Sequence, residues 1–370
     1  MRELSESQRF RVVRVYFRLP PEPGGMEAHV ARLSAAQRQL GVDVLNVYNT
    51  GCPNGAAVQL FSERNLLPIR PSALRDAIFF AGAIINWRRL RCTLPTVLHV
   101  HGDWSAFICS RLLARVVGAK AVVASLHDTI PRKPRLYRWA LSHCDLIFST
   151  GKRDQVWLEG VLGRSVCHLP SAPLDVFYRR HTSLKTSSCD VITVANFVPK
   201  KRLDLVLECA ASCPDLEFVI YGEGPERKEL SSRARKDGVT NIRFPGRLPA
   251  DQIAVALKLA RVFLLTSEAE GTPTAALEAM AAGLPVVLTP SNEYGWLIER
   301  GINGYVTKSW EVDELVATIR GVLADEERRV AMGSAGRTRA QEYSWRANAE
   351  RVSGLMAETL DLTWKAANKK

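Results

Sequence analysis

Two glutamates eight residues apart, Glu270 and Glu278, lie in the segment SEAEGTPTAALEAMAAGLPVV at residues 267–287. An ionised carboxylate only accepts hydrogen bonds, so each glutamate suits a cluster of hydroxyl groups such as a ribose diol or a sugar ring. The Thr-Pro-Thr run at 272–274 begins a predicted helix, because proline is favoured in a first helical turn. The free N–H groups of that turn, together with the helix dipole, predict a diphosphate site.

Basic side chains complement these carboxylates. The segment ANFVPKKRLDLVLE (195–208) follows a predicted strand, and its Lys201 is a cation that could pair with an anionic ligand. The turn FPGRLP (244–249) places Arg247 after another predicted strand. Lys201 and helix N–H groups would stabilise negative charge that develops on a leaving group, without a metal ion.

Histidines end two predicted strands in the first half of the chain. In TVLHVH (96–101), alternation puts His99 and His101 on one face, with His101 at the carboxyl end. His127 follows the strand KAVVASL (120–126). A histidine at the carboxyl end of a strand can act on a ligand because its charge changes near neutral pH, so His101 and His127 are candidate functional side chains.

The elements that must position these residues alternate along the chain. Short β-branched runs are followed by helical stretches, which is the pattern of a parallel, doubly wound sheet. The first series of predicted strands is RVVRVYF, DVLNVYN, TVLHVH, KAVVASL and CDLIFST, and a helix is predicted over 24–41. The second series is DVITVAN, LEFVIYG, NIRFPG, RVFLLTS and PVVLT. Ligands of such sheets bind beyond the carboxyl ends of the strands, where the candidate residues fall.

A linker separates the two series. Residues 171–188, SAPLDVFYRRHTSLKTSS, are rich in serine, basic and aperiodic. We therefore expect an α/β protein of two Rossmann-like, doubly wound parallel-sheet domains, over residues 1–180 and 181–345. Two such sheets facing each other would enclose a ligand-binding cleft.

Segment 267–287 resembles the signature of the retaining glycosyltransferases of family 4, which have the two-domain GT-B fold. The signature has two glutamates eight apart, then Ala-Met-Ala, a glycine and Pro-Val. The matching positions are Glu270, Glu278, Ala279, Met280, Ala281, Gly283, Pro285 and Val286. The resemblance covers nearly the whole chain: 195–208 is similar to the phosphate loop of the family, and PPEPGGMEAHV (20–30) is similar to its N-terminal glycine loop.

The resemblance implies a role for each candidate residue. Glu278 would bind the ribose of the donor nucleotide, and we expect Glu270, His101 and Lys201 to act in catalysis at the donor sugar and diphosphate. The other expected donor-binding residues are Gly271, Thr272, Pro273, Thr274, Asn196, Arg247, Gly24 and Gly25. The segment 346–370 is expected to cross back to the first, acceptor-binding domain, as in other GT-B proteins.

Two departures from the family pattern bear on activity. Asn196 stands where many members have an arginine, and an amide supplies no charge, so Lys200 and Arg202 are the neighbouring candidates to compensate. In the loop at 291–296, Asn and Glu replace a pair of glycines and Trp replaces an acidic residue. This altered loop is expected to face the donor or the acceptor.

The charge of the chain is divided unevenly. The net charge is +12; residues 1–185 hold 26 basic and 13 acidic side chains (+13), and residues 186–370 hold 24 and 25 (−1). Basic residues interleave with aromatic and apolar ones in NWRRLR (86–91) and PRKPRLYRW (131–139), as at a membrane interface. An anionic membrane is therefore a candidate partner, and the alternative is a solvated basic face. The basic residues form no single run or RNA-binding signature, so nucleic acid is not expected.

Several features that the sequence lacks narrow the interpretation. The start MRELSESQRF has no apolar core of a signal peptide, and the longest apolar run, 77–85, is too short to span a bilayer. The eight cysteines form no metal-binding pattern, and no D-x-D motif occurs. We expect a cytoplasmic protein, peripheral at the inner face of the cytoplasmic membrane, with no metal or cofactor.

The sequence therefore predicts a retaining glycosyltransferase of bacterial cell-surface polysaccharide or glycolipid synthesis. The expected donor is a UDP- or GDP-sugar, and the expected acceptor is a saccharide or a lipid-linked group. The resemblance implies front-face transfer, in which the departing phosphate helps to deprotonate the acceptor. The alternatives are a nucleotide-sugar epimerase of the same fold, which needs no acceptor, and a non-catalytic nucleotide- or glycan-binding protein.

Overall fold

The computed structural model describes residues 9–19, 25–53, 55–62, 65–66, 68–69, 71–127, 133–179, 189–290 and 294–361. Contacts group the chain into two compact units: unit 1 is Met1–Ser171 with Trp345–Lys370, and unit 2 is Ala172–Ser344. The first unit therefore ends before the expected boundary at 180. The reason is that α7 (Asp175–Tyr178) packs against the helices α10 and α11 of unit 2, where Phe177 enters the apolar core.

Unit 1 is built on a seven-stranded parallel sheet with the order β3-β2-β1-β4-β5-β6-β7. Its strands are β1 (Arg11–Val15), β2 (Asp43–Tyr48), β3 (Ala57–Gln59), β4 (Thr96–His101), β5 (Ala121–Leu126), β6 (Leu146–Ser149) and β7 (Cys167–His168). Its helices are α1 (Gly25–Gln39), α2 (Ser72–Ile85), α3 (Trp87–Leu90), α4 (Trp104–Val117), α5 (Pro134–Leu141), α6 (Lys152–Leu162) and α14 (Trp345–Thr359).

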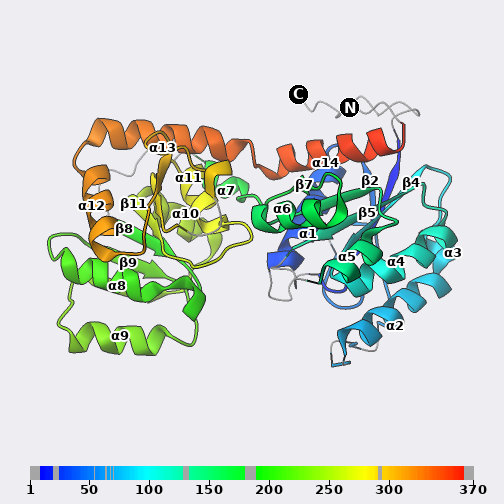
Figure 1. The fold of residues 1–370 in the computed structure, drawn as a ribbon, viewed down its shortest axis with the longest axis horizontal. Helices are drawn as coiled ribbons and strands as arrows, with labels where there is room; N and C mark the ends of the chain where they lie inside the picture. Colours follow the sequence, from blue (N-terminus) through cyan, green and yellow to red (C-terminus); the bar gives the residue numbers. More distant parts are fainter. Residues whose placement is uncertain are drawn as a thin grey trace. The chain divides into compact units, whose positions relative to one another are not determined.

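Helices cover the sheet of unit 1, which explains why its strands are almost continuously apolar. α2, α4, α5 and α6 pack side by side in that order, and α1 packs against the C-terminal helix α14 (Figure 1). α4 begins after Asp103, whose carboxylate accepts a hydrogen bond from the Trp104 N–H, and ends at Gly118 in the left-handed region (φ 72°). These signals place the start of α4 directly after β4.

The helix α14 returns to unit 1 through polar as well as apolar contacts. Gln37 Nε2 donates to Ser353 Oγ (2.9 Å), and Asn348 Nδ2 donates to the carbonyl of Pro170 (2.8 Å). The Trp345 ring lies edge-on to His29, with ring centroids 5.1 Å apart. The last helix of the chain is therefore part of the packed structure of unit 1.

Unit 2 has a six-stranded parallel sheet with the order β10-β9-β8-β11-β12-β13. Its strands are β8 (Cys189–Val194), β9 (Phe218–Tyr221), β10 (Ile242–Gly246), β11 (Ala260–Leu265), β12 (Val286–Leu288) and β13 (Gly304–Val306). Its other helices are α8 (Leu203–Ser212), α9 (Arg227–Lys236), α10 (Ala250–Lys258), α11 (Thr274–Ala281), α12 (Val312–Leu323) and α13 (Glu326–Gln341), with 3-10 turns η2 (Pro199–Lys201) and η3 (Tyr294–Trp296).

Two doubly wound parallel sheets confirm the predicted fold class. The sequence did not predict β3, β7 and β13, because their two or three residues lie in no continuous apolar run, unlike the equally short β12. In the ranges that the structure describes, no helix is long and apolar enough to cross a bilayer.

Candidate functional site

Each sheet has a switch point, where the strand order reverses. It lies between β1 and β4 in unit 1 and between β8 and β11 in unit 2. Ligands of open α/β sheets bind beyond the carboxyl ends of the strands at such a point. His101 ends β4, Lys201 follows β8 and Glu270 follows β11, so the three predicted catalytic residues all lie at a switch point.

Two loops are joined at the switch point of unit 2. Lys201 Nζ forms an ion pair with Glu270 Oε1, and the two side chains are only 16% and 11% exposed. Thr266 Oγ1 donates to the Lys201 carbonyl (2.8 Å), and the Glu268 N–H donates to the Lys200 carbonyl (2.8 Å). The ion pair is thus held between two loops that hydrogen bonds fix to each other.

Arg202 shapes the first of these loops. It has left-handed backbone angles (φ 46°, ψ 47°), which are uncommon outside glycine and cluster at functional sites. Its guanidinium pairs with Asp204 (2.9 Å) and Glu268 (3.5 Å). The Arg202 guanidinium is therefore neutralised by two carboxylates. No residue pattern in the sequence predicted its left-handed backbone.

The helix after Glu270 begins slightly later than predicted. α11 starts at Thr274, and Pro273 is the capping residue before it rather than the first helical residue. The Thr274 N–H donates to the Thr272 carbonyl (2.8 Å), whereas the next two N–H groups have no acceptor within the helix. Gly271, Thr272 and Glu278 are half-buried, and Glu278 lies on the second turn of the helix.

The structure brings two other predicted donor-binding residues together. Arg247 Nη2, after β10, donates to Asn196 Oδ1, after β8, at 3.2 Å. Both side chains are exposed. The turn at Gly222 packs under this loop, and a Cβ there would lie 1.8 Å from the Ala195 carbonyl oxygen. The Asn196 side chain supplies no charge itself, but it accepts a hydrogen bond that orients the charged Arg247 guanidinium.

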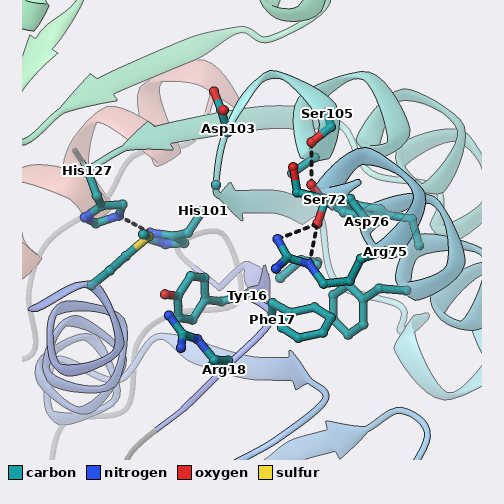
Figure 2. A pocket seen from close by; sticks show the side chains of 16 residues that line it. Tyr16, Phe17, Arg18, Ser72, Arg75, Asp76, His101, Asp103, Ser105 and His127 are labelled. Atoms are coloured by element: carbon teal, nitrogen blue, oxygen red, sulfur yellow. Dashed lines mark hydrogen bonds and ion pairs between the residues drawn. The ribbon is translucent and has the colours of Figure 1, made fainter. Parts of the chain in front are cut away.

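A pocket of about 280 Å³ lies at the switch point of unit 1 (Figure 2). Segments that follow β1 and β4, together with α2 and the start of α4, form its wall. The wall includes Tyr16, Phe17, Arg18, Arg75, Asp76 and His101. Apart from His101 and His127, the pocket residues were not predicted, because an Arg-Asp pair inside an apolar helix has no motif that marks it.

Charges in the pocket wall are matched by partners within unit 1. Arg75 pairs with Asp76 (3.3 Å), and its guanidinium lies 4.8 Å from the centroid of the Phe17 ring. Arg18 pairs with the buried Glu27 (2.7 Å). Asp76 also accepts a hydrogen bond from Ser105 (Figure 2). The pocket therefore combines apolar rings with arginines that are each paired with a carboxylate.

His101 faces this pocket as a neutral imidazole. His101 is 3% exposed, and its Nδ1 lies 2.7 Å from His127 Nε2. Burial, followed by the nearby His99, His127 and Arg14, lowers the pKa of His101 well below its usual range. Within the part of the chain that the structure describes, the buried His101 Nε2 has no hydrogen-bond partner. The predicted side-by-side placement of His99 and His101 is confirmed, with ring centroids 4.2 Å apart.

Arg14 lies beneath these histidines, and the sequence assigned it no role. Arg14 is 0% exposed in β1. Its Nη1 donates a hydrogen bond to Ser34 Oγ (2.7 Å), and its Nη2 donates a hydrogen bond to Gln37 Oε1. Arg14 Nη2 lies 3.2 Å from His99 Nδ1. Because a guanidinium only donates, His99 Nδ1 accepts, and its proton lies on Nε2, which donates to Ser125 Oγ (2.7 Å). A buried cation thus fixes the tautomer of His99.

Some predicted positions fall outside the described residues. Gly24 is one of them, whereas Gly25 is the first residue of α1. In the altered loop, residues 291–293 are likewise outside, and Trp296 ends η3 with its carbonyl accepting a hydrogen bond from Tyr343 (3.2 Å).

Comparison with known proteins identifies the family of this chain. Residues 23–170 match the family model described as Glycosyltransferase Family 4, and residues 177–339 match Glycosyl transferases group 1. The chain belongs to glycosyltransferase family 4. The two matches meet near the boundary between the units, so this glycosyltransferase has the two-domain GT-B fold.

Relatives of this glycosyltransferase act on varied substrates. Sulfoquinovosyl transferase SQD2 of Arabidopsis thaliana is 29% identical over 165 residues, which cover 44% of this chain and only 32% of that protein. The GDP-mannose-dependent alpha-(1-6)-phosphatidylinositol monomannoside mannosyltransferase of Mycolicibacterium smegmatis is 27% identical over 276 residues, which cover 66% and 72%. Among solved structures, Anabaena HepE in complex with UDP superposes with a TM-score of 0.75 at 16% identity, covering 94% of this chain and all of that one.

Proposed function

We propose that this family 4 glycosyltransferase moves a sugar, with retention, from a nucleotide-diphosphate sugar to a saccharide or lipid-linked acceptor. The observation that supports this most strongly is the Lys201–Glu270 ion pair, set between two loops at the switch point of unit 2. A cation and a carboxylate in that position suit a substrate with a diphosphate on one side and hydroxyl groups on the other.

In the proposed reaction, the bond between the anomeric carbon and the diphosphate oxygen breaks while the acceptor oxygen bonds to the same face of the sugar. The acceptor proton passes to an oxygen of the departing phosphate. Lys201 and the first-turn N–H groups of α11 stabilise the charge on the leaving diphosphate without a metal ion. Glu270 faces the donor sugar, and Arg247, oriented by Asn196, adds a second cation.

The donor is a UDP- or GDP-sugar in this proposal. Glu278, on α11, accepts hydrogen bonds from the ribose hydroxyls. The bound UDP in the Anabaena HepE structure and the GDP-mannose dependence of the mycobacterial relative support these two bases.

The pocket of unit 1 suits a neutral, hydroxylated ring of the acceptor. Arg18 and Arg75 each pair with a carboxylate, so a phosphate would find neither of these two cations unpaired. The Phe17 ring, the Tyr16 hydroxyl and the neutral His101 offer an apolar face and hydrogen bonds, as a sugar or cyclitol ring requires. We assign the enzyme to glycolipid or surface-polysaccharide synthesis at the cytoplasmic face of a membrane, which the phosphatidylinositol mannoside substrate of its relative supports.

Glu270→Ala provides the test of this function. The wild-type protein is expected to be stabilised by one series among UDP-, GDP-, ADP- and dTDP-sugars in a thermal-shift assay that contains EDTA. The variant should keep the shift with the bare nucleoside diphosphate but lose transfer to an acceptor panel, because the glutamate acts at the sugar and not at the phosphates. Normal transfer by the variant would reject the role of Glu270. Acceptor-independent turnover would favour an epimerase, and binding without turnover by the wild type would favour a non-catalytic protein.

A further inference from the structure

The outward face of α2 is apolar. Leu74, Ala77, Ala81 and Ile85 are exposed and recur every three or four residues, so they form one stripe along the helix. Leu74 is 50% exposed and Ile85 is 79% exposed. A surface helix normally turns charged and polar residues to water on this side. Between Ser72 and Ile85, however, no exposed side chain is charged, because Asp76 is buried and Arg75 is half-buried against Phe17.

Cations lie at the end of this stripe. α2 runs into α3 at Asn86, and the exposed Arg88, Arg89 and Arg91 follow, two of them with guanidinium groups over the Trp87 ring. No acidic residue lies between Asp76 and Asp103, so these arginines have no carboxylate neighbour in sequence. The end of α2 thus combines an exposed isoleucine with a cluster of positive charge.

The neighbouring helices have the same combination. On α4, Leu112 is 55% exposed between the exposed Arg111 and Arg115. On α5, Trp139 is 59% exposed beside the exposed Arg135 and Arg138. α2, α4 and α5 are successive helices of one layer in unit 1 (Figure 1). Exposed apolar side chains surrounded by arginine are typical of surfaces that enter the headgroup region of an anionic bilayer.

We propose that α2 is a membrane-docking helix: Leu74, Ala77, Ala81 and Ile85 insert into the headgroup boundary of an anionic bilayer, and Arg88, Arg89 and Arg91 contact its lipid headgroups. Charge complementarity selects this occupant, because a protein partner or a second copy of the chain would need carboxylates opposite three arginines. Insertion removes the apolar stripe from water, and the arginines hold the helix at the surface.

A second face of α2 connects this docking to the acceptor. Ser72, Arg75, Asp76 and Phe79 lie on the same helix and line the pocket of unit 1 (Figure 2). Docking of α2 would therefore bring the pocket to the bilayer surface. This step rests on the proposed function: the acceptor would be a lipid whose polar ring leaves the membrane to enter the pocket.

Vesicle co-sedimentation of the full chain tests the docking separately from transfer, because no sugar nucleotide is present. We expect binding to vesicles that contain phosphatidylglycerol, weak binding to phosphatidylcholine alone, and a decrease with added salt. Replacing Leu74 and Ile85 with serine should reduce binding at least about tenfold, since each buried methylene contributes about fourfold. Arg88→Gln with Arg89→Gln should reduce it by about fivefold for each arginine.

Matched changes in unit 2 provide the control. Ile302 and Val330 are 51% and 60% exposed, and their replacement by serine should leave vesicle binding unchanged, as should Arg235→Gln with Lys236→Gln on α9. Equal binding by the α2 variants and the wild type would overturn the proposal. Equal binding of the wild type to neutral vesicles would also overturn it. A wild-type dimer that becomes monomeric on changing Leu74 and Ile85, with vesicle binding intact, would make the stripe a subunit interface instead.

Discussion

The two units of this glycosyltransferase use the same sheet topology for different chemistry. At the switch point of unit 1 stands a pocket of paired charges, aromatic rings and neutral histidines. At the switch point of unit 2 stand two loops that hold a lysine against a glutamate. The arrangement of the strands determines where functional side chains can lie close together. The loops that follow the strands determine which side chains these are. In the proposed function, a neutral acceptor ring and a charged donor would each bind at one of these switch points.

The largest difference that we predict between the two units is their stability at acid pH. It arises from the buried histidines of unit 1. His29, His99 and His101 are buried in unit 1, where burial lowers the pKa of each well below the usual value near 6.5. Below that pH the unfolded chain binds protons that the folded unit excludes. Unit 1 should therefore lose up to about 1.4 kcal/mol of stability per pH unit for each histidine as the pH falls.

Calorimetry at pH 7.5 and pH 5.5, with limited proteolysis to assign the transitions, measures this effect. Unit 2 contains one histidine, His181, which lies outside the described residues, and its described residues contain none, so that unit is the internal control. An equal loss of stability in both units would show that the buried histidines do not dominate the pH dependence of unfolding.

Lys201→Ala tests the role of the ion-paired lysine at the switch point of unit 2. Removing a preorganised group that stabilises developing charge lowers kcat by about a hundred- to a thousandfold in comparable sites. We expect a loss of that size, measured as steady-state transfer once a donor is known. Lys200→Ala is the control, because Lys200 is exposed and contributes its backbone carbonyl rather than its ammonium group to the loop contact. Similar losses in both variants would mean that general positive charge matters rather than the paired lysine.

Glu278→Ala should have the smallest of the three effects, since it removes hydrogen bonds to one part of the donor. We expect the affinity for the nucleoside diphosphate to fall by about 1.5–3 kcal/mol, the range for hydrogen bonds to a charged group. Titration calorimetry measures it, and Glu229→Ala, exposed in the first turn of α9, controls for loss of a carboxylate in the same unit. An unchanged affinity would remove Glu278 from the donor site.

The sequence predicted the strands and helices better than the contacts between side chains. Long strands such as β4 and β11 were predicted because buried parallel strands show as continuous apolar runs. Lys201 and Glu270 were predicted because each lies after such a strand in a segment that resembles the family. Arg14 was missed, since a buried arginine among valines is marked only by contacts with Ser34 and His99 from distant segments. Neither did any local pattern indicate that Asn196 receives a hydrogen bond from Arg247, 51 residues away.

The return of α14 to unit 1 has a consequence for synthesis of the chain. Unit 1 uses Ser353 to bond Gln37 and Trp345 to cover His29, so its structure cannot be completed until the last helix has left the ribosome. Unit 2 is a continuous segment, 172–344, and its whole sequence emerges before that helix. Most multidomain chains fold from the N-terminus onward as they are made. In this chain the segment of unit 2 is synthesised in full before unit 1 can be completed, because unit 1 requires a helix that follows unit 2 in the sequence.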